Sequence, residues 1–133
     1  MQKPWLKSYP KGIAEEIDIN EFSSVADIFD TSIAKYSERP AYTNFGKTLS
    51  YKEVDNYTAQ LGSYLKNELG LKKGDRVAVM MPNLLQNPIA IFGILRAGLV
   101  VVNTNPLYTT RELKHQLNDS GAKAIIIVEN FAH

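Results

Sequence analysis

The chain has 133 residues, of which 44% are hydrophobic and 22% charged, and its formal net charge is +1. A chain of this length buries about two-thirds of its unfolded surface, so we expect one domain. The balance of acids and bases argues against a nucleic-acid-binding protein, and the absence of cysteine excludes disulfides, thiolate nucleophiles and cysteine-based metal sites.

No segment has the pattern of a membrane span or of a signal peptide. The most apolar stretch, residues 88–102, is shorter than the roughly 20 residues that cross a bilayer, and it contains Arg96. The N-terminus lacks the uninterrupted apolar core of a signal peptide. These patterns favour a cytoplasmic location.

Residues 1–22 are predicted to form an extended N-terminal arm, because prolines and a glycine interrupt every periodic pattern. Four of its side chains offer apolar surface for contacts: Trp5, Leu6, Tyr9 and Ile13. We expect the arm to lie along the body of the domain, with a homodimer contact as the alternative. Lys3 and Lys7 beside the aromatic residues make peripheral membrane contact a further alternative.

Two helices around a short hairpin are predicted over residues 23–70. Ser23 or Ser24 can cap the first helix, whose apolar residues recur at helical spacing. Strands at 41–45 and 48–50 are expected to pair through a turn at Gly46-Lys47. Ser50 and Glu53 form a capping box that opens the second helix.

Alternating strands and helices are predicted over residues 71–128. The three strands, at 76–81, 99–103 and 124–128, are almost continuously apolar, which is typical of parallel strands covered on both faces. Asn87 is the expected cap of the helix that follows the first strand. A capping box of Thr109 and Glu112 opens the next helix, which Gly121 ends.

The predicted fold class is therefore α/β, a three-layer βαβαβ parallel sheet preceded by a helical and hairpin segment. The last strand ends close to His133, with no closing helix to cover the sheet. We therefore expect residues 23–133 to be an incomplete α/β subdomain, truncated from a larger domain.

The sequence lacks the loops that hold nucleotides in common α/β folds. The turn after the first strand, residues 82–87, contains no glycine, and neither GxGxxG nor GxxxxGK[ST] occurs. The amides near Asn87 could bind an anion, but a plain helix cap is the favoured interpretation. The basic turn at 72–76 could also contact a phosphate, but a solvated loop that leads into a strand is the favoured interpretation.

No other residue is convincing as a catalyst or metal ligand. His115 and His133 lack carboxylate or cysteine partners at ligand spacing, and zinc needs three or four convergent groups. The adjacent acids Glu15 and Glu16, and the pair Asp27 and Asp30, are neighbours in sequence only. No GxSxG nucleophile elbow is present. We predict no catalytic, cofactor-binding or metal-ligating residue in this chain.

Several segments in order resemble the N-terminal part of acyl- and aryl-CoA ligases, members of the adenylate-forming superfamily. They are SYKEVDNYTAQLGSYL (50–65), LKKGDRVAVMMPN (71–83), ILRAGLVVVNTNPLY (94–108) and RELKHQLNDSGAKAIIIV (111–128). KPWLKSYPKGI (3–13) and MMPNLLQNPIAIFGILRAG (80–98) are similar to bacterial long-chain fatty acid–CoA ligases. Thr110 departs from the proline usual in these ligases, and threonine fits the same first helical turn.

This resemblance implies a two-step reaction, in which ATP activates a fatty acid as an acyl adenylate and CoA then displaces AMP. The implied cofactors are ATP, Mg²⁺ and CoA, held by groups that lie downstream in the family, so the fragment itself is expected to be inactive and to bind none of them. Its implied partner is the remainder of its own ligase chain, at the inner face of the membrane. A ligase for another carboxylic acid and a stand-alone Rossmann-like interaction module are the alternatives.

Overall fold

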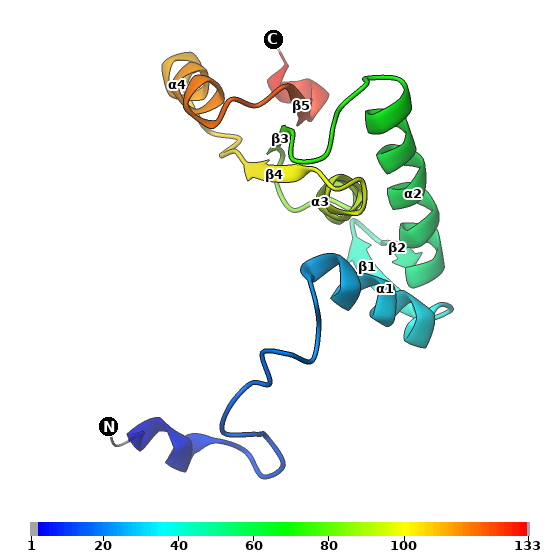
Figure 1. Ribbon diagram of the computed structural model, residues 1–133, viewed down its shortest axis with the longest axis vertical. Coiled ribbons are helices and arrows are strands. Elements are labelled where there is room, and N and C mark those ends of the chain that lie inside the picture. The colour runs from blue at the N-terminus through cyan, green and yellow to red at the C-terminus, as the bar shows by residue number, and fades with distance from the viewer. Residues whose placement is uncertain (1–2, 133) are drawn as a thin grey trace.

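The computed structural model describes residues 3–132, which form an α/β fold with two separate sheets (Figure 1). The elements are α1 (Val25–Tyr36), β1 (Pro40–Asn44), β2 (Lys47–Ser50), α2 (Tyr51–Asn67), β3 (Arg76–Met80), α3 (Gln86–Arg96), β4 (Val100–Asn103), α4 (Thr110–Ser120) and β5 (Ala124–Ile127). Two short 3-10 helices, η1 (Pro4–Ser8) and η2 (Glu129–Phe131), lie towards the two ends. No helix in the described part combines the length and apolar character needed to cross a bilayer.

The larger sheet is parallel, with the strand order β4-β3-β5. Arg76 of β3 lies opposite Val100 of β4, and Val77 lies opposite Ala124 of β5. Strand β4 pairs with one edge of β3 and β5 with the other, so the two connections run in opposite directions across the sheet. Because both connections are right-handed, α3 and α4 lie on opposite faces (Figure 1). This topology confirms the predicted three-layer α/β fold.

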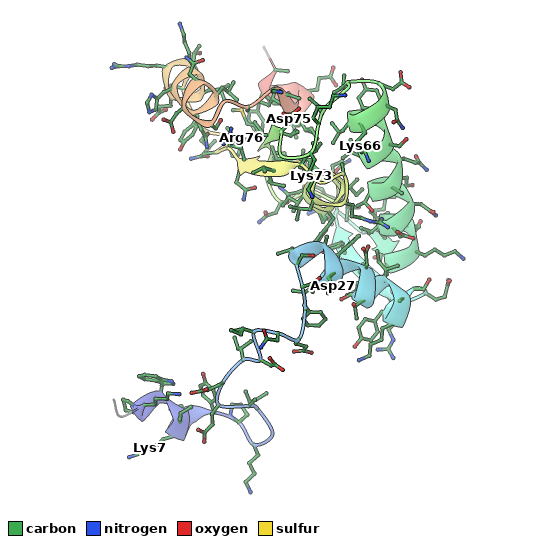
Figure 2. The ribbon with its side chains drawn as sticks, in the orientation of Figure 1. Lys7, Asp27, Lys66, Lys73, Asp75 and Arg76 are labelled. Atoms are coloured by element: carbon green, nitrogen blue, oxygen red, sulfur yellow. The ribbon has the colours of Figure 1, made fainter. Side chains whose placement is uncertain are left out.

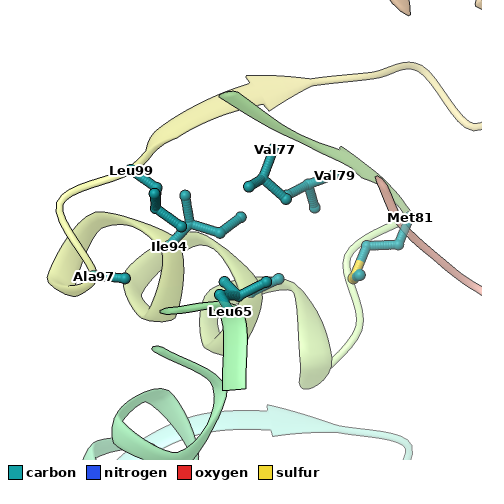
Figure 3. Close-up of a cluster of buried hydrophobic side chains, with 8 residues drawn as sticks. Leu65, Val77, Val79, Met81, Ile94, Ala97 and Leu99 are labelled. Atoms are coloured by element: carbon teal, nitrogen blue, oxygen red, sulfur yellow. The ribbon is translucent and has the colours of Figure 1, made fainter. Parts of the chain in front are cut away.

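The main core lies between β3, α2 and α3 (Figure 3). Ile94 of α3 and Val77 of β3 are fully buried, as is Leu65 of α2. The buried members of the cluster are Leu65, Val77, Val79, Met81, Ala90, Ile94, Ala97 and Leu99. Helix α3 is therefore held between the sheet and α2.

Two glycines allow α2 and α3 to approach closely. A Cβ atom at Gly93 would lie 2.9 Å from Cδ2 of Leu61, and one at Gly62 would lie 3.2 Å from the carbonyl oxygen of Gly93. Both distances are shorter than ordinary van der Waals contact, so a side chain at Gly93 would displace Leu61 and one at Gly62 would press on the backbone of α3.

A second, smaller core joins α1 to the hairpin and to α3. The rings of Phe29 and Phe92 stack with centroids 4.1 Å apart, and Leu49 and Val54 are buried beside Phe29. Three of the four predicted caps are confirmed: the Ser24 hydroxyl accepts a hydrogen bond from the Asp27 amide, and the helices α2 and α4 both begin with complete capping boxes. Gly121 ends α4 with a φ of 62°, as expected for a left-handed helix stop.

Three local predictions were wrong. The hairpin turn is Phe45-Gly46, one residue earlier than expected. Asn87 is not a cap: its amide donates to the Leu84 carbonyl oxygen at 3.0 Å, so the helical turn has already begun before it. Of the three strands, only β3 is buried along most of its length, because β4 and β5 are edge strands of the sheet.

The N-terminal segment does not lie along the body, contrary to our expectation. It contains the 3-10 helix η1 and extends away from the helices and sheets (Figure 1). Trp5, Tyr9 and Ile13 are exposed on it. The apolar surface of this segment therefore contacts little within the described chain.

Candidate functional site

A groove lies between the hairpin and α3 and includes the loop after the central strand. Its volume is about 420 Å³, which falls within the range of ligand-sized pockets. In parallel α/β sheets, ligands bind beyond the carboxyl ends of the strands, where this loop lies. The groove is lined by Tyr42, Thr43, Asn44, Asn83, Leu84, Leu85, Asn87, Pro88, Ile91 and Phe92.

One long-range hydrogen bond closes the groove at the hairpin. The side-chain amide Nδ2 of Asn44 donates to the carbonyl oxygen of Asn83 at 3.2 Å, which fixes the tip of the hairpin to the loop after β3. Burial raises the pKa of the Tyr42 phenol, and the nearby Tyr51 adds to this effect. Tyr42 is therefore neutral at physiological pH.

The lining contains no Asp, Glu, Lys, Arg or His. It combines aliphatic and aromatic side chains with amide and hydroxyl groups, so it has no group that titrates near neutral pH. Such a surface suits an uncharged, largely apolar partner. The residues of the groove do not fit Mg²⁺ or a triphosphate, which require carboxylates and cationic donors.

The sequence candidates for acid–base or metal chemistry do not come together. His115 is exposed on α4 beside Glu112 and Asp119, in an open hollow of about 740 Å³. Residues 3–132 contain no group of three or more His, Cys, Asp or Glu side chains placed to hold a metal ion. His133 lies outside the described residues.

Several of the acidic candidates form local hydrogen bonds. Hydrogen bonds from the Ser23 amide and hydroxyl lower the pKa of Asp27. Glu112 accepts from the Thr109 hydroxyl at 2.7 Å and from its amide at 2.8 Å, and these bonds lower its pKa too. Glu15 and Glu16 are exposed, and Glu16 pairs with Lys3.

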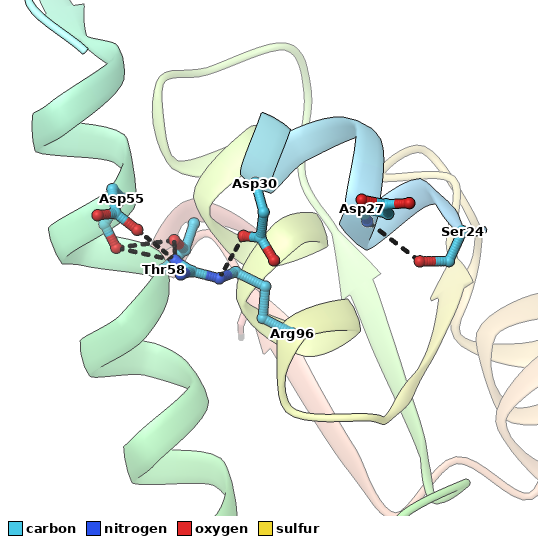
Figure 4. Close-up of polar contacts among 6 residues, drawn as sticks. All are labelled: Ser24, Asp27, Asp30, Asp55, Thr58 and Arg96. Carbon is cyan, nitrogen blue, oxygen red and sulfur yellow. Dashed lines mark hydrogen bonds and ion pairs between the residues drawn. The ribbon is translucent and has the colours of Figure 1, made fainter. Parts of the chain in front are cut away.

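Asp30 belongs to a polar cluster that sequence reasoning missed (Figure 4). Arg96, at the end of α3, reaches Asp30 of α1 at 3.2 Å and both Asp55 and Thr58 of α2 at 2.7 and 2.8 Å. Its guanidinium also lies over the Phe29 ring, 5.6 Å from the centroid. The available signal was a lone arginine within the most apolar stretch of the chain.

The basic turn before β3 is organised around Asp75 (Figure 2). Its carboxylate accepts from the Lys72 amide at 2.8 Å and pairs with Lys123 Nζ at 2.7 Å. The Lys123 bond is the main cause of a lowered pKa for Asp75, followed by the Lys72 amide. The turn leads into β3, as predicted, and Asp75 links it to the segment before β5.

Comparison with known proteins identifies the family. Residues 29–133 match the model of the AMP-binding enzymes. The chain belongs to this family. The match covers both sheets and all four α-helices except the first turn of α1.

Long-chain-fatty-acid–CoA ligases are among the most similar relatives in this family. The chain is 55% identical over all 133 residues to such a ligase from Escherichia coli O6:H1, and covers 24% of it. A ligase of the same name from Bacillus subtilis is 40% identical over 128 residues, which is 96% of this chain and 22% of that protein. The chain thus spans about a quarter of the length of these relatives.

Solved structures of AMP-binding enzymes share the fold. The N-terminal subdomain of Klebsiella oxytoca NpsA, in complex with anthranilyl-AMSN, aligns with a TM-score of 0.76 and 26% identity. The alignment covers 82% of this chain and 28% of that one. This α/β chain therefore matches the N-terminal part of adenylation domains.

Proposed function

We propose that this chain is the N-terminal scaffold of a ligase that activates a long-chain fatty acid with ATP and transfers the acyl group to CoA. The main support for this proposal is the 55% identity to a long-chain-fatty-acid–CoA ligase along the entire chain. That identity includes the N-terminal arm, which the family model leaves unmatched.

The chemistry of the described residues supports a scaffold role. In adenylate formation a carboxylate oxygen attacks the α-phosphate of ATP and displaces pyrophosphate, which requires groups that neutralise phosphate charge. The groove lacks such groups, and Asp27, Asp75 and Glu112 hold local structure instead. We therefore assign ATP, Mg²⁺ and CoA to the remainder of the ligase chain, and no catalytic step to a residue of this chain.

The proposed organisation has two parts. Residues 1–22 form an arm, and residues 23–133 form an α/β subdomain that the remainder of the ligase completes. Because long-chain fatty acids partition into lipid, we place the parent enzyme in the cytoplasm at the inner face of the membrane. The exposed Trp5 and Tyr9, beside Lys3 and Lys7, are the arm's candidates for contact with lipid or with a second subunit.

A ligase for an aromatic acid is the competing candidate, because the NpsA structure contains an anthranilyl compound. The 26% identity to NpsA is far below the identity to the fatty acid ligases. The two candidates differ in the acid that the enzyme activates and can be separated with matched substrates.

The test is ATP–pyrophosphate exchange by the full-length reading frame, with hexadecanoate and benzoate as alternative acids. We expect exchange with hexadecanoate, formation of its CoA thioester when CoA is added, and no exchange by the 133-residue chain alone. Exchange with benzoate only would favour the aromatic alternative. Exchange by the short chain alone would overturn its assignment as an inactive scaffold.

A further inference from the structure

Phe45, at the tip of the hairpin, is unusual both in its backbone conformation and in its exposure. It has a φ of +47°, and it is the one non-glycine residue with positive φ among residues 3–132. Together with Gly46, at φ +76°, it forms a turn that normally favours Asn-Gly. Its side chain is also 93% exposed, so the described chain gains almost no burial from an aromatic residue here.

Two further observations concern the groove and the carboxyl end of the sheet. Phe45 directly follows Asn44, whose side chain lines the groove and bonds to the loop after β3. Leu107, in the loop after β4, is 81% exposed at the same carboxyl end of the sheet. A strained, exposed aromatic residue therefore stands next to a groove that carries no charged side chain.

We propose that Phe45 and the groove form a docking surface for an apolar segment of the ligase polypeptide beyond this chain. The inference rests on the proposed function, since it needs a parent ligase. The region matched in the Escherichia coli relative is only 24% of that protein, so most of its polypeptide lies outside. An unfavourable local choice at a surface is expected where a contact compensates for it.

The shape of the surface favours a protein segment over a small ligand. A small molecule would use the groove but would gain nothing from a side chain that projects into solvent. A folded segment can receive Phe45 in a pocket of its own while it fills the groove, and buried aromatic anchors of this kind dominate many interfaces. The uncharged lining selects an apolar segment, because burying an unpaired charge there would be unfavourable.

The proposal is tested by whether Phe45→Asn raises or lowers the thermal midpoint of the full-length ligase relative to the wild type. The turn geometry alone predicts a higher midpoint, because Asn-Gly suits a turn with two positive φ angles. Loss of a docked aromatic side chain predicts a fall of roughly 2–4 °C. We expect the fall, and we expect Phe45→Leu to keep a midpoint closer to that of the wild type because it retains an apolar side chain.

Ile17→Asn is the matched control, since Ile17 is 87% exposed and belongs to the N-terminal arm, a segment that extends away from the helices and sheets (Figure 1). We expect this variant to leave the midpoint unchanged. An equal or higher midpoint for Phe45→Asn than for the wild type would overturn the proposal. A fall that is accompanied by dissociation of a dimer, measured by light scattering, would assign the surface to a second copy and also overturn it.

Activity separates this test from the proposed function. An active long-chain ligase whose midpoint does not fall with Phe45→Asn contradicts the docking surface alone. A full-length protein that activates no long-chain fatty acid, yet loses thermal stability with Phe45→Asn, contradicts the substrate assignment alone.

Discussion

The two helices that cover opposite faces of the parallel sheet differ sharply in burial. Helix α3 buries Ala90, Gly93 and Ile94 between the sheet and α2, whereas α4 has no buried residue. Helix α3 is apolar over most of its length and has no side-chain cap, whereas α4 is strongly amphipathic and begins with a complete capping box. A helix can therefore form without a side-chain cap, and its burial follows the share of apolar residues in its sequence.

The same contrast runs through the strands. Four of the five residues of β3 are buried, but β4 and β5 have none. The three sequences are similarly apolar, so their composition did not indicate which strand would be central. The difference arises from strand order, since β3 has neighbours on both sides and the other two have one each.

The strongest test of this contrast compares one apolar side chain from each of the two helices. Ile94→Ala removes a fully buried side chain from the main core, and we expect it to lower the free energy of unfolding by about 2–5 kcal/mol. Leu117→Ala on α4 should cost about 1 kcal/mol or less, because Leu117 is only half-buried. Urea denaturation measures both, and equal losses would contradict the contrast.

The Arg96 cluster offers a second, smaller effect on the α3 face. We expect Arg96→Ala to lower the free energy of unfolding by roughly 1.5–3 kcal/mol, because it leaves Asp30 and Asp55 without their partner. Lys52→Ala is the control: its ion pair with Glu38 is exposed, and we expect a loss of about 0–1 kcal/mol. A loss for Arg96→Ala no larger than that of the control would show that the cluster does not join the helices.

The smallest expected effect concerns Asp75, which links the turn before β3 to Lys123. Its pKa is lowered in the folded state, so its contribution to stability is present above its ordinary pKa of 3.8 and is lost as the pH falls through the folded value. The wild type should therefore have a higher thermal midpoint than Asp75→Asn at about pH 6, and this advantage should shrink below pH 3.8. A difference that does not depend on pH would exclude the ionised carboxylate as its cause.

Much of the fold could be predicted because its signals are local. The capping boxes at Ser50 and Thr109, the stop at Gly121 and the βαβαβ order each depend on residues within a few positions of one another. The error at Asn87 has a local cause as well. The loop from Leu84 already takes a helical turn, which a rule based on preferred cap residues does not anticipate.

The groove could not be predicted because it joins segments about forty residues apart. The hydrogen bond from Asn44 to Asn83 spans 39 positions, so no local pattern links the two residues. The Arg96 cluster could not be predicted for the same reason, since Asp55 lies 41 positions from Arg96 in the sequence. Contacts of this kind follow from how the layers pack, which a single sequence does not state directly.

The position of β3 between β4 and β5 has a consequence for synthesis on the ribosome. The first of the three strands to emerge is the one with two neighbours in the finished sheet, and its partners are translated later, β4 before β5. Until then, the apolar surface of β3 can be shielded by α2, which precedes it in the nascent chain. The sheet then grows outward from its middle, first on one side and then on the other.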